Sequence, residues 1–167
     1  MQSVRDYFAP FDTEIEKYAE GVHLLNEGAE ESAVRAFEQR YDVRLPYYYR
    51  EWLKIHNGGE LFAVPAGTVL SGLCGDNEPI AGESYLESNF DPVKRGGVPP
   101  EIFIIADTNF GDVIGFDLTR TNQYDGKVVE WSHESGEISQ TWESLIEWLT
   151  DELEQGAMTV DYNGDDK

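Results

Sequence analysis

The sequence predicts an α+β fold: a mainly antiparallel sheet flanked by N-terminal helices and by one C-terminal helix. Two observations support it. In the second half, three short runs rich in β-branched and aromatic residues are bounded by Gly, Asp or Asn, at 102–106, 113–118 and 127–131. Elsewhere, before residue 56 and after residue 140, apolar residues recur at helical spacing. Because only short turns separate the three runs, we expect them to form a meander.

The first of these runs, Ile-Phe-Ile-Ile-Ala at 102–106, contains no polar residue. We therefore expect a strand that is buried on both faces and central in the sheet. The second run, 113–118, alternates as a one-sided strand does. Between them, Asp107 to Asp112 supplies Asn, Gly and Asp, which are typical turn residues.

Three helices are expected before the sheet. Residues 1–11 lack a clear pattern, and Pro10 is expected to end any local structure there. A first helix is predicted from Asp12 or Thr13, as N-cap, through Leu25, with Gly28 as a break. A second helix follows over about 30–41, and a third over 47–55, with Pro46 as its first residue.

The remaining elements are shorter or less regular. Residues 60–73 suit two short strands or one edge strand with a bulge, and 74–97 are irregular apart from a short helix at 83–90. A turn is expected at 134–137. A last helix is predicted from Thr141, as N-cap, to Gly156, with Trp148 off its apolar stripe.

Length and composition fit a single domain over residues 1–167, with its core at about 12–156 and a frayed acidic tail at 157–167. The N-terminus has no apolar leader, and no run of 18 apolar residues occurs, so we expect a cytoplasmic protein. The one cysteine, Cys74, excludes an internal disulfide and a zinc cluster built on cysteines.

The formal net charge of −21, from 12 Lys and Arg against 33 Asp and Glu, argues against nucleic acid or an anionic membrane as a direct partner. A basic protein is the natural complement to such a surface. Solubility or adaptation to a salty host explains the same charge equally well.

Catalytic, metal and cofactor sites are not indicated. Residues 107–118 begin like a calcium loop, but position five is Gly and position twelve is Leu118, so we interpret 107–112 as a turn. His23 and His56 form no metal pair, and His133 is expected to bond a neighbouring carboxylate. Neither a phosphate loop nor a dinucleotide fingerprint is present. We therefore expect a protein that is not an enzyme and has no cofactor.

Several motifs, in order, resemble the SUKH superfamily of Smi/Knr-type proteins related to the yeast cell-wall-assembly regulator. The residues that carry the resemblance are Leu45-Pro46, the aromatic helix that ends in Asn57-Gly58-Gly59, Ile104-Ile105-Ala106-Asp107 with Gly111-Asp112 and the strand that contains Asp117, Val128-Val129-Glu130-Trp131 with His133-Glu134, and the Trp-containing helix 141–149. The resemblance covers roughly residues 30–153.

The resemblance implies an α+β fold and a binding role without a transferable active site. Bacterial members are commonly immunity proteins that bind and neutralise a cognate toxin, often a nuclease, and nuclease toxins tend to be basic. The alternative is a regulatory interaction scaffold with no toxin partner. For the partner surface, the acids near the loops of the sheet are the candidates: Asp76, Glu78, Asp107, Asp112 and Glu130. The oligomeric state is left open.

Overall fold

The computed structural model describes residues 1–63, 67–74 and 84–167, and within them the strands form one seven-stranded sheet in the order β1-β2-β3-β4-β5-β6-β7. Every neighbouring pair is antiparallel. The strands are β1 (Leu24–Leu25), β2 (Gly59–Leu61), β3 (Thr68–Leu70), β4 (Ile102–Asp107), β5 (Val113–Thr121), β6 (Gly126–Ser132) and β7 (Glu137–Trp142). The helices are α1 (Val4–Ile15), α2 (Glu31–Tyr41), α3 (Tyr47–Ile55), the 3₁₀ turn η1 (Leu86–Phe90), α4 (Pro92–Arg95) and α5 (Leu145–Ala157). The predicted α+β class is confirmed.

Strand β4 lies in the middle of the sheet, as its apolar sequence predicts. Four of its six residues are buried, and β4, β5 and β6 pair consecutively. A bulge between Ile104 and Ala106 lets Ile105 and Ala106 both turn inward. The predicted meander is therefore confirmed, and the structure adds β7 as its fourth strand.

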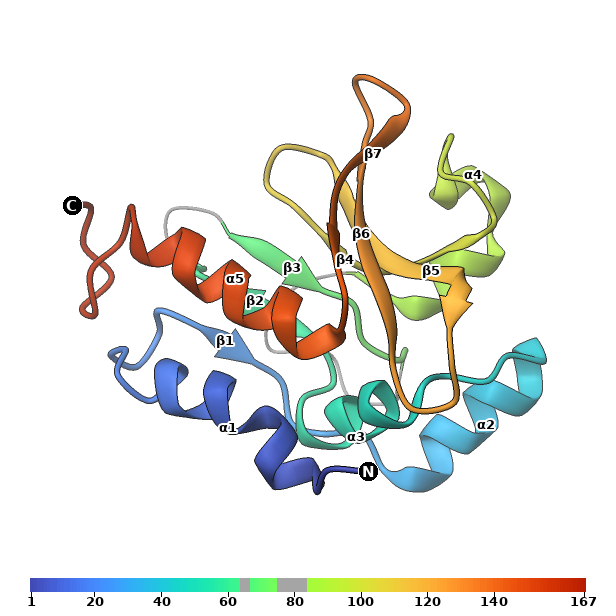
Figure 1. Cartoon of the computed structure of the whole chain (residues 1–167), viewed down its shortest axis with the longest axis horizontal. Coiled ribbons are helices and arrows are strands. Elements are labelled where there is room, and N and C mark those ends of the chain that lie inside the picture. The colour runs from blue at the N-terminus through green and yellow to red at the C-terminus, as the bar shows by residue number, and fades with distance from the viewer. Residues whose placement is uncertain (64–66, 75–83) are drawn as a thin grey trace.

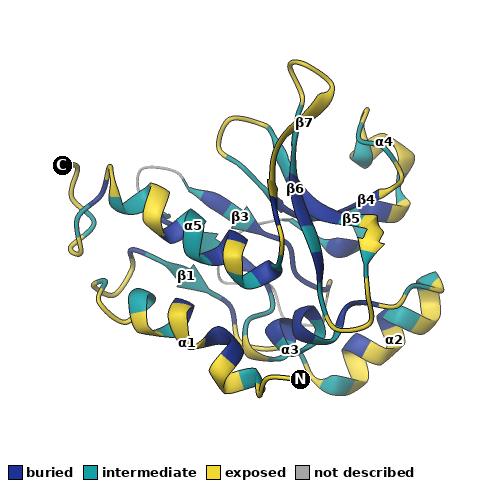
Figure 2. Ribbon diagram, viewed as in Figure 1, coloured by how far each residue is buried: buried dark blue, intermediate teal, exposed yellow. Residues whose placement is uncertain are grey.

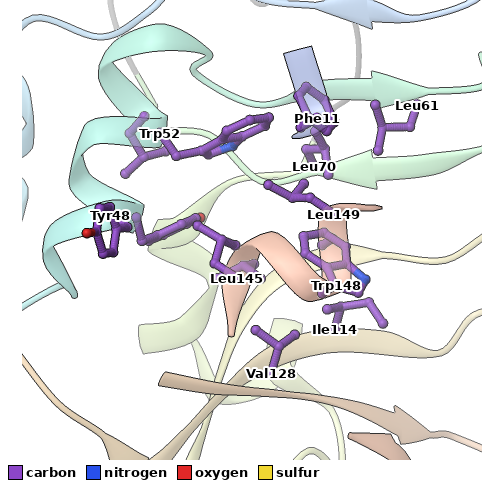
Figure 3. Close-up of a cluster of buried hydrophobic side chains, with 14 of the residues drawn as sticks. Phe11, Tyr48, Trp52, Leu61, Leu70, Ile114, Val128, Leu145, Trp148 and Leu149 are labelled. Carbon is purple, nitrogen blue, oxygen red and sulfur yellow. The ribbon is translucent and has the colours of Figure 1, made fainter. Parts of the chain in front are cut away.

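Helices α1, α3 and α5 lie on one side of the sheet and enclose the main core between them (Figure 1). In the close-up, Leu145, Trp148 and Leu149 of α5 point into a cluster that includes Ile114 and Val128 of the sheet (Figure 3). The rings of Phe11 and Trp52, from α1 and α3, meet edge to face at 5.1 Å in the same cluster.

The first helix lies earlier than predicted. Helix α1 spans Val4–Ile15, with Ser3 as its N-cap and Pro10 inside it, and Leu24 and Leu25 belong to strand β1. The prediction of a helix over 13–25 was wrong. Tyr7, Phe8 and Phe11 bury one face of α1, and that burial outweighs the single hydrogen bond lost at Pro10.

The last helix starts later than predicted. Thr141 is not its N-cap, because residues 137–142 pair with β6 as strand β7. The cap is Ser144, whose Oγ accepts a hydrogen bond from the amide of Glu147 at 3.2 Å. The spacing Ser144-x-x-Glu147 is that of a capping box, a signal that was present in the sequence and was missed.

Two residues of α5 have roles that the apolar stripe did not suggest. Trp148 is 2% exposed, because α5 packs against both the sheet and α1 and so buries a wider arc than one stripe. Gly156 lies inside the helix rather than after it. A Cβ there would sit 2.0 Å from the ring of Phe62, so this glycine permits close packing.

The C-terminal residues 157–167, for which we expected fraying, are folded back on the N-terminal region. Val160 is 4% exposed and forms an isolated bridge with Asp166. The amide of Ala19 donates to the carbonyl of Tyr162 at 2.7 Å, and the Tyr18 and Tyr162 rings meet edge to face at 4.9 Å.

Two side chains replace strand pairing at the start of β4, where β3 has separated from it. Asn89 of η1 accepts a hydrogen bond from the Ile104 amide at 2.7 Å and donates one to the Ile104 carbonyl at 2.8 Å. Arg95 of α4 donates to the carbonyl of Ile102 at 2.7 Å. Within the short helix predicted at 83–90, Leu86–Phe90 form a 3₁₀ turn that covers the edge of β4, and residue 83 lies outside the described residues. Among the described residues, no helix is long and apolar enough to cross a membrane.

Stability is expected to fall in mild acid because of His23. Burial lowers the pKa of His23 to about 4 from 6.5, and burial also lowers the pKa of His56. Between pH 4 and 6.5, His23 therefore binds a proton in the unfolded chain but not in the folded chain. The histidine contribution is therefore fully present above pH 6.5 and is lost toward pH 4, at about 1.4 kcal/mol per pH unit for each proton.

Urea unfolding of the wild type and of His23→Asn between pH 7.5 and 4.5 measures this effect. The asparagine variant keeps an acceptor, Oδ1, for the Phe62 amide, which bonds His23 Nδ1 at 3.1 Å, but it cannot be protonated in this range. Its stability should therefore depend less steeply on pH. If the free energy of unfolding falls equally with pH in the two proteins, His23 is not the cause of the loss in acid.

Candidate functional site

Asp107 ends β4 and belongs to a chain of hydroxyl hydrogen bonds. Its carboxylate accepts from Ser84 Oγ at 2.6 Å, and Ser84 Oγ lies 2.7 Å from Ser71 Oγ. Asp107 is half-buried. The residue therefore helps to hold the segment at Ser84 against the sheet.

Asp112 lies between the turn at 108–111 and the first residue of β5, Val113, and it binds His133. Its Oδ1 accepts from the His133 amide at 2.9 Å and lies 2.8 Å from the ring Nδ1. Burial acts to raise the pKa of Asp112, but these hydrogen bonds outweigh it and hold the pKa below its usual value. The interpretation of 107–112 as a turn is confirmed by the Thr108 amide, which bonds the Asp112 carbonyl at 2.8 Å.

Glu130 lies on the opposite face of the sheet from Asp107. Strand registers place Asp107, Val113, Trp131 and Ile138 side by side on one face, the face without α5. Glu130 pairs with the buried Ile114 on the α5 side, where its Oε1 accepts from Ser139 Oγ at 2.5 Å. The remaining two candidates, Asp76 and Glu78, lie outside the described residues.

A pocket of about 430 Å³ opens where β3 and β4 separate. Val69, Asp107 and Val113 contribute from the sheet, and Lys94 and Arg95 from α4. The Arg95 guanidinium is occupied by the carbonyls of Asn89, Pro99 and Ile102 and by the Asn89 side chain. No histidine or cysteine is among the described residues that line this pocket, and its charged side chains are Asp107, Lys94 and Arg95.

Toward the C-terminal end of the sequence, the acidic residues occur without Lys or Arg. Residues 128–166 contain eleven of the 33 Asp and Glu residues and no Lys or Arg. Within the described chain, only Glu143 of these eleven forms an ion pair, with Lys127 at 2.5 Å. Elsewhere, acids such as Glu31 are matched by cations, since Arg35, Arg50 and Lys54 surround it.

Around β7 and α5, several of these unmatched acids lie close together. Asp151 accepts hydrogen bonds from the indole of Trp142 at 3.0 Å and from Gln140 at 3.4 Å. Glu152, bonded by the Thr68 hydroxyl, has a raised pKa because of burial and the nearby charges of Asp151 and Glu130. In the parts of the chain that are described, no group of three His, Cys, Asp or Glu residues could hold a metal ion.

The fold and this site define an α+β domain whose β7–α5 region carries acids without matching cations. The chain belongs to the SMI1/KNR4 family (SUKH-1), whose family pattern matches residues 28–151. A protein from Pseudomonas syringae pv. tomato, known from its crystal structure, is similar in fold with a TM-score of 0.58. It shares 19% identity, and the match covers 87% of this chain and 98% of that chain. No curated protein matches the sequence.

Proposed function

We propose that this protein is an immunity protein that binds and neutralises a cognate bacterial toxin, and that the toxin is a basic nuclease. Membership of the SMI1/KNR4 family supports a protein-binding role rather than catalysis. The observation that carries the proposal further is the set of acids in residues 128–166 that lack matching cations. Such a surface favours a partner of opposite charge.

The proposed mechanism is occlusion without chemistry. A nuclease needs a basic cleft to hold the phosphates of its substrate, and an acidic protein surface can occupy the same cleft. Charge attraction accelerates the encounter, and apolar contacts slow the separation of the two proteins. The toxin is then inhibited stoichiometrically, because its substrate is excluded for as long as the complex lasts.

The five candidate contact residues differ in what supports them. Asp107 and Asp112 hold neighbouring segments through Ser84 and His133, which gives each a structural role. Glu130 lies among the unmatched acids near α5, and we favour it as a partner contact. Asp76 and Glu78 remain proposals based on the sequence.

We expect the product of the adjacent gene to copurify with this protein and to lose its nuclease activity at a 1:1 ratio. The association rate should fall at least roughly tenfold between 50 and 500 mM salt, because charge-steered association is strongly screened. Stopped-flow mixing at several salt concentrations measures this rate. A tight complex whose association rate does not respond to salt would remove the electrostatic part of the proposal.

An adjacent gene product that fails to bind at any salt concentration would instead contradict the immunity function. That result would favour the regulatory scaffold, for which pulled-down endogenous partners would be the next measurement.

A further inference from the structure

Strand β7 forms an open edge of the sheet. Five of its six residues are exposed, and Figure 2 shows this strand in the exposed colour along most of its length. Strand β6 pairs with one side of β7. Among the described residues, no segment forms a backbone hydrogen bond with its other side. A bulge at Ser139 interrupts the pairing with β6, and on either side of it alternate amides and carbonyls of β7 point away from the sheet, as on an edge strand.

The two faces beside this edge differ in chemistry. On the face away from α5, Ile138 is 48% exposed and pairs with the half-buried Trp131. On the α5 side, Gln140 pairs with Glu130 and is bonded to Asp151. A strand laid along β7 would thus have an apolar surface next to one of its faces and carboxylates next to the other.

The charges of this region also determine which strand can bind. A second copy of the chain paired through β7 would bring two sets of unmatched carboxylates together, which costs free energy through like-charge repulsion. An extended segment with Lys or Arg on one face gains from the same carboxylates. The acids around β7 therefore oppose self-pairing and favour a basic partner.

We propose that β7 is a docking edge, to which an extended basic segment of the partner adds as an eighth, antiparallel or parallel strand. Alternate side chains of that segment are Lys or Arg on the face that carries Gln140, Glu130 and Asp151, and the intervening ones are apolar on the face that carries Ile138 and Trp131. Backbone hydrogen bonds supply the affinity and the alternation supplies the specificity. The inference rests on the proposed function and names the part of the surface that meets the partner.

A synthetic ten-residue peptide in which Lys alternates with Val or Thr serves as the probe. The matched control has the same sequence with every second amide N-methylated, which keeps the charge and removes the hydrogen-bond donors of one edge. We expect the control to bind the full chain roughly tenfold more weakly, or about 1.4 kcal/mol. Amides within 137–142 should exchange more slowly with the unmodified peptide bound. Equal affinity of the two peptides would overturn strand addition.

A pair of variants distinguishes an effect of the β7 edge on peptide binding from an effect of the net charge. Glu137→Lys lies in β7 and Glu16→Lys lies at the end of α1, and each changes the net charge by the same amount. We expect the β7 variant to bind the unmodified peptide several-fold more weakly than the wild type does. The affinity of the α1 variant should stay within about twofold of the wild-type value. Equal weakening by both variants would overturn the assignment to β7.

The toxin experiment distinguishes this inference from the proposed function. If the adjacent gene product binds tightly while the amides of β7 keep their free exchange rates, the docking edge is wrong and the immunity function stands. If it does not bind, the immunity function is wrong, and the two peptides alone decide whether β7 accepts a basic strand.

Discussion

Replacing Trp148 by alanine is expected to lower the free energy of unfolding by about 3–5 kcal/mol, the range for truncating a large buried aromatic side chain. Trp148 is 2% exposed and lies in the main core with Leu145, Leu149 and Ile114 (Figure 3). Its removal leaves a cavity between α5 and the sheet. Urea unfolding followed by circular dichroism measures the loss.

Two further substitutions test the reason for this loss. Trp148→Phe should lower the free energy of unfolding much less than the alanine variant does, because phenylalanine still fills most of the space with an aromatic ring. The indole N–H that it removes has no acceptor among the described residues, so no hydrogen bond is lost. Trp131→Ala removes a half-buried indole on the other face, so its cost should stay below about 2 kcal/mol. If both tryptophans cost the same on truncation, the core does not lie on the α5 side alone.

The second large effect is expected at Asp125, in the turn between β5 and β6. Its Oδ1 accepts from the amides of Gly126 at 2.9 Å and Leu145 at 3.1 Å, and its Oδ2 accepts from the Tyr7 hydroxyl. The Tyr7 oxygen in turn accepts from the amide of Ile146 at 3.1 Å. Asp125 and Tyr7 thus satisfy the first two amides of α5, and burial together with the Asp125 carboxylate raises the pKa of Tyr7.

Asp125→Ala should therefore lower the free energy of unfolding by about 2–4 kcal/mol, because it leaves buried donors unpaired and removes a negative charge from the positive end of a helix. Tyr7→Phe keeps the stacking on Tyr48, at 3.6 Å between ring centroids, and should cost about 1–3 kcal/mol. Thermal unfolding of each variant checks these values.

The exposed Glu134→Ala, in the hairpin between β6 and β7, is the control and should change stability by less than about 0.5 kcal/mol. A loss at Asp125 no larger than this would mean that the network contributes nothing to stability. Because α5 follows β7 directly, a loosened α5 would also disturb the edge strand, so binding tests should use variants outside this network.

The roles of the candidate acids could be predicted only in part. The turn residues Asp107 and Asp112 were found from turn chemistry, and His133 was expected to bond a carboxylate, which proved to be Asp112. The hydrogen bond from Ser84 to Asp107 had no local signal, because 23 residues separate the two partners in sequence. The placement of Glu130 on the face opposite Asp107 follows from strand register, and a single sequence shows register only after the pairing is known.

The sequence by itself determined the class of fold, the central position of β4 and the limits of α2 and α3, because those signals are local: an uninterrupted apolar run, helical spacing, and proline or glycine at the ends. Only the tertiary structure decided that residues 4–15 are helical despite Pro10, that 24–25 and 137–142 are strands, and that Trp148 is central to the core. In each of these, contacts between distant segments supply more free energy than local preference does. The open edge at β7 is likewise a property of the assembled sheet, since a strand becomes an edge only when no other strand lies beyond it.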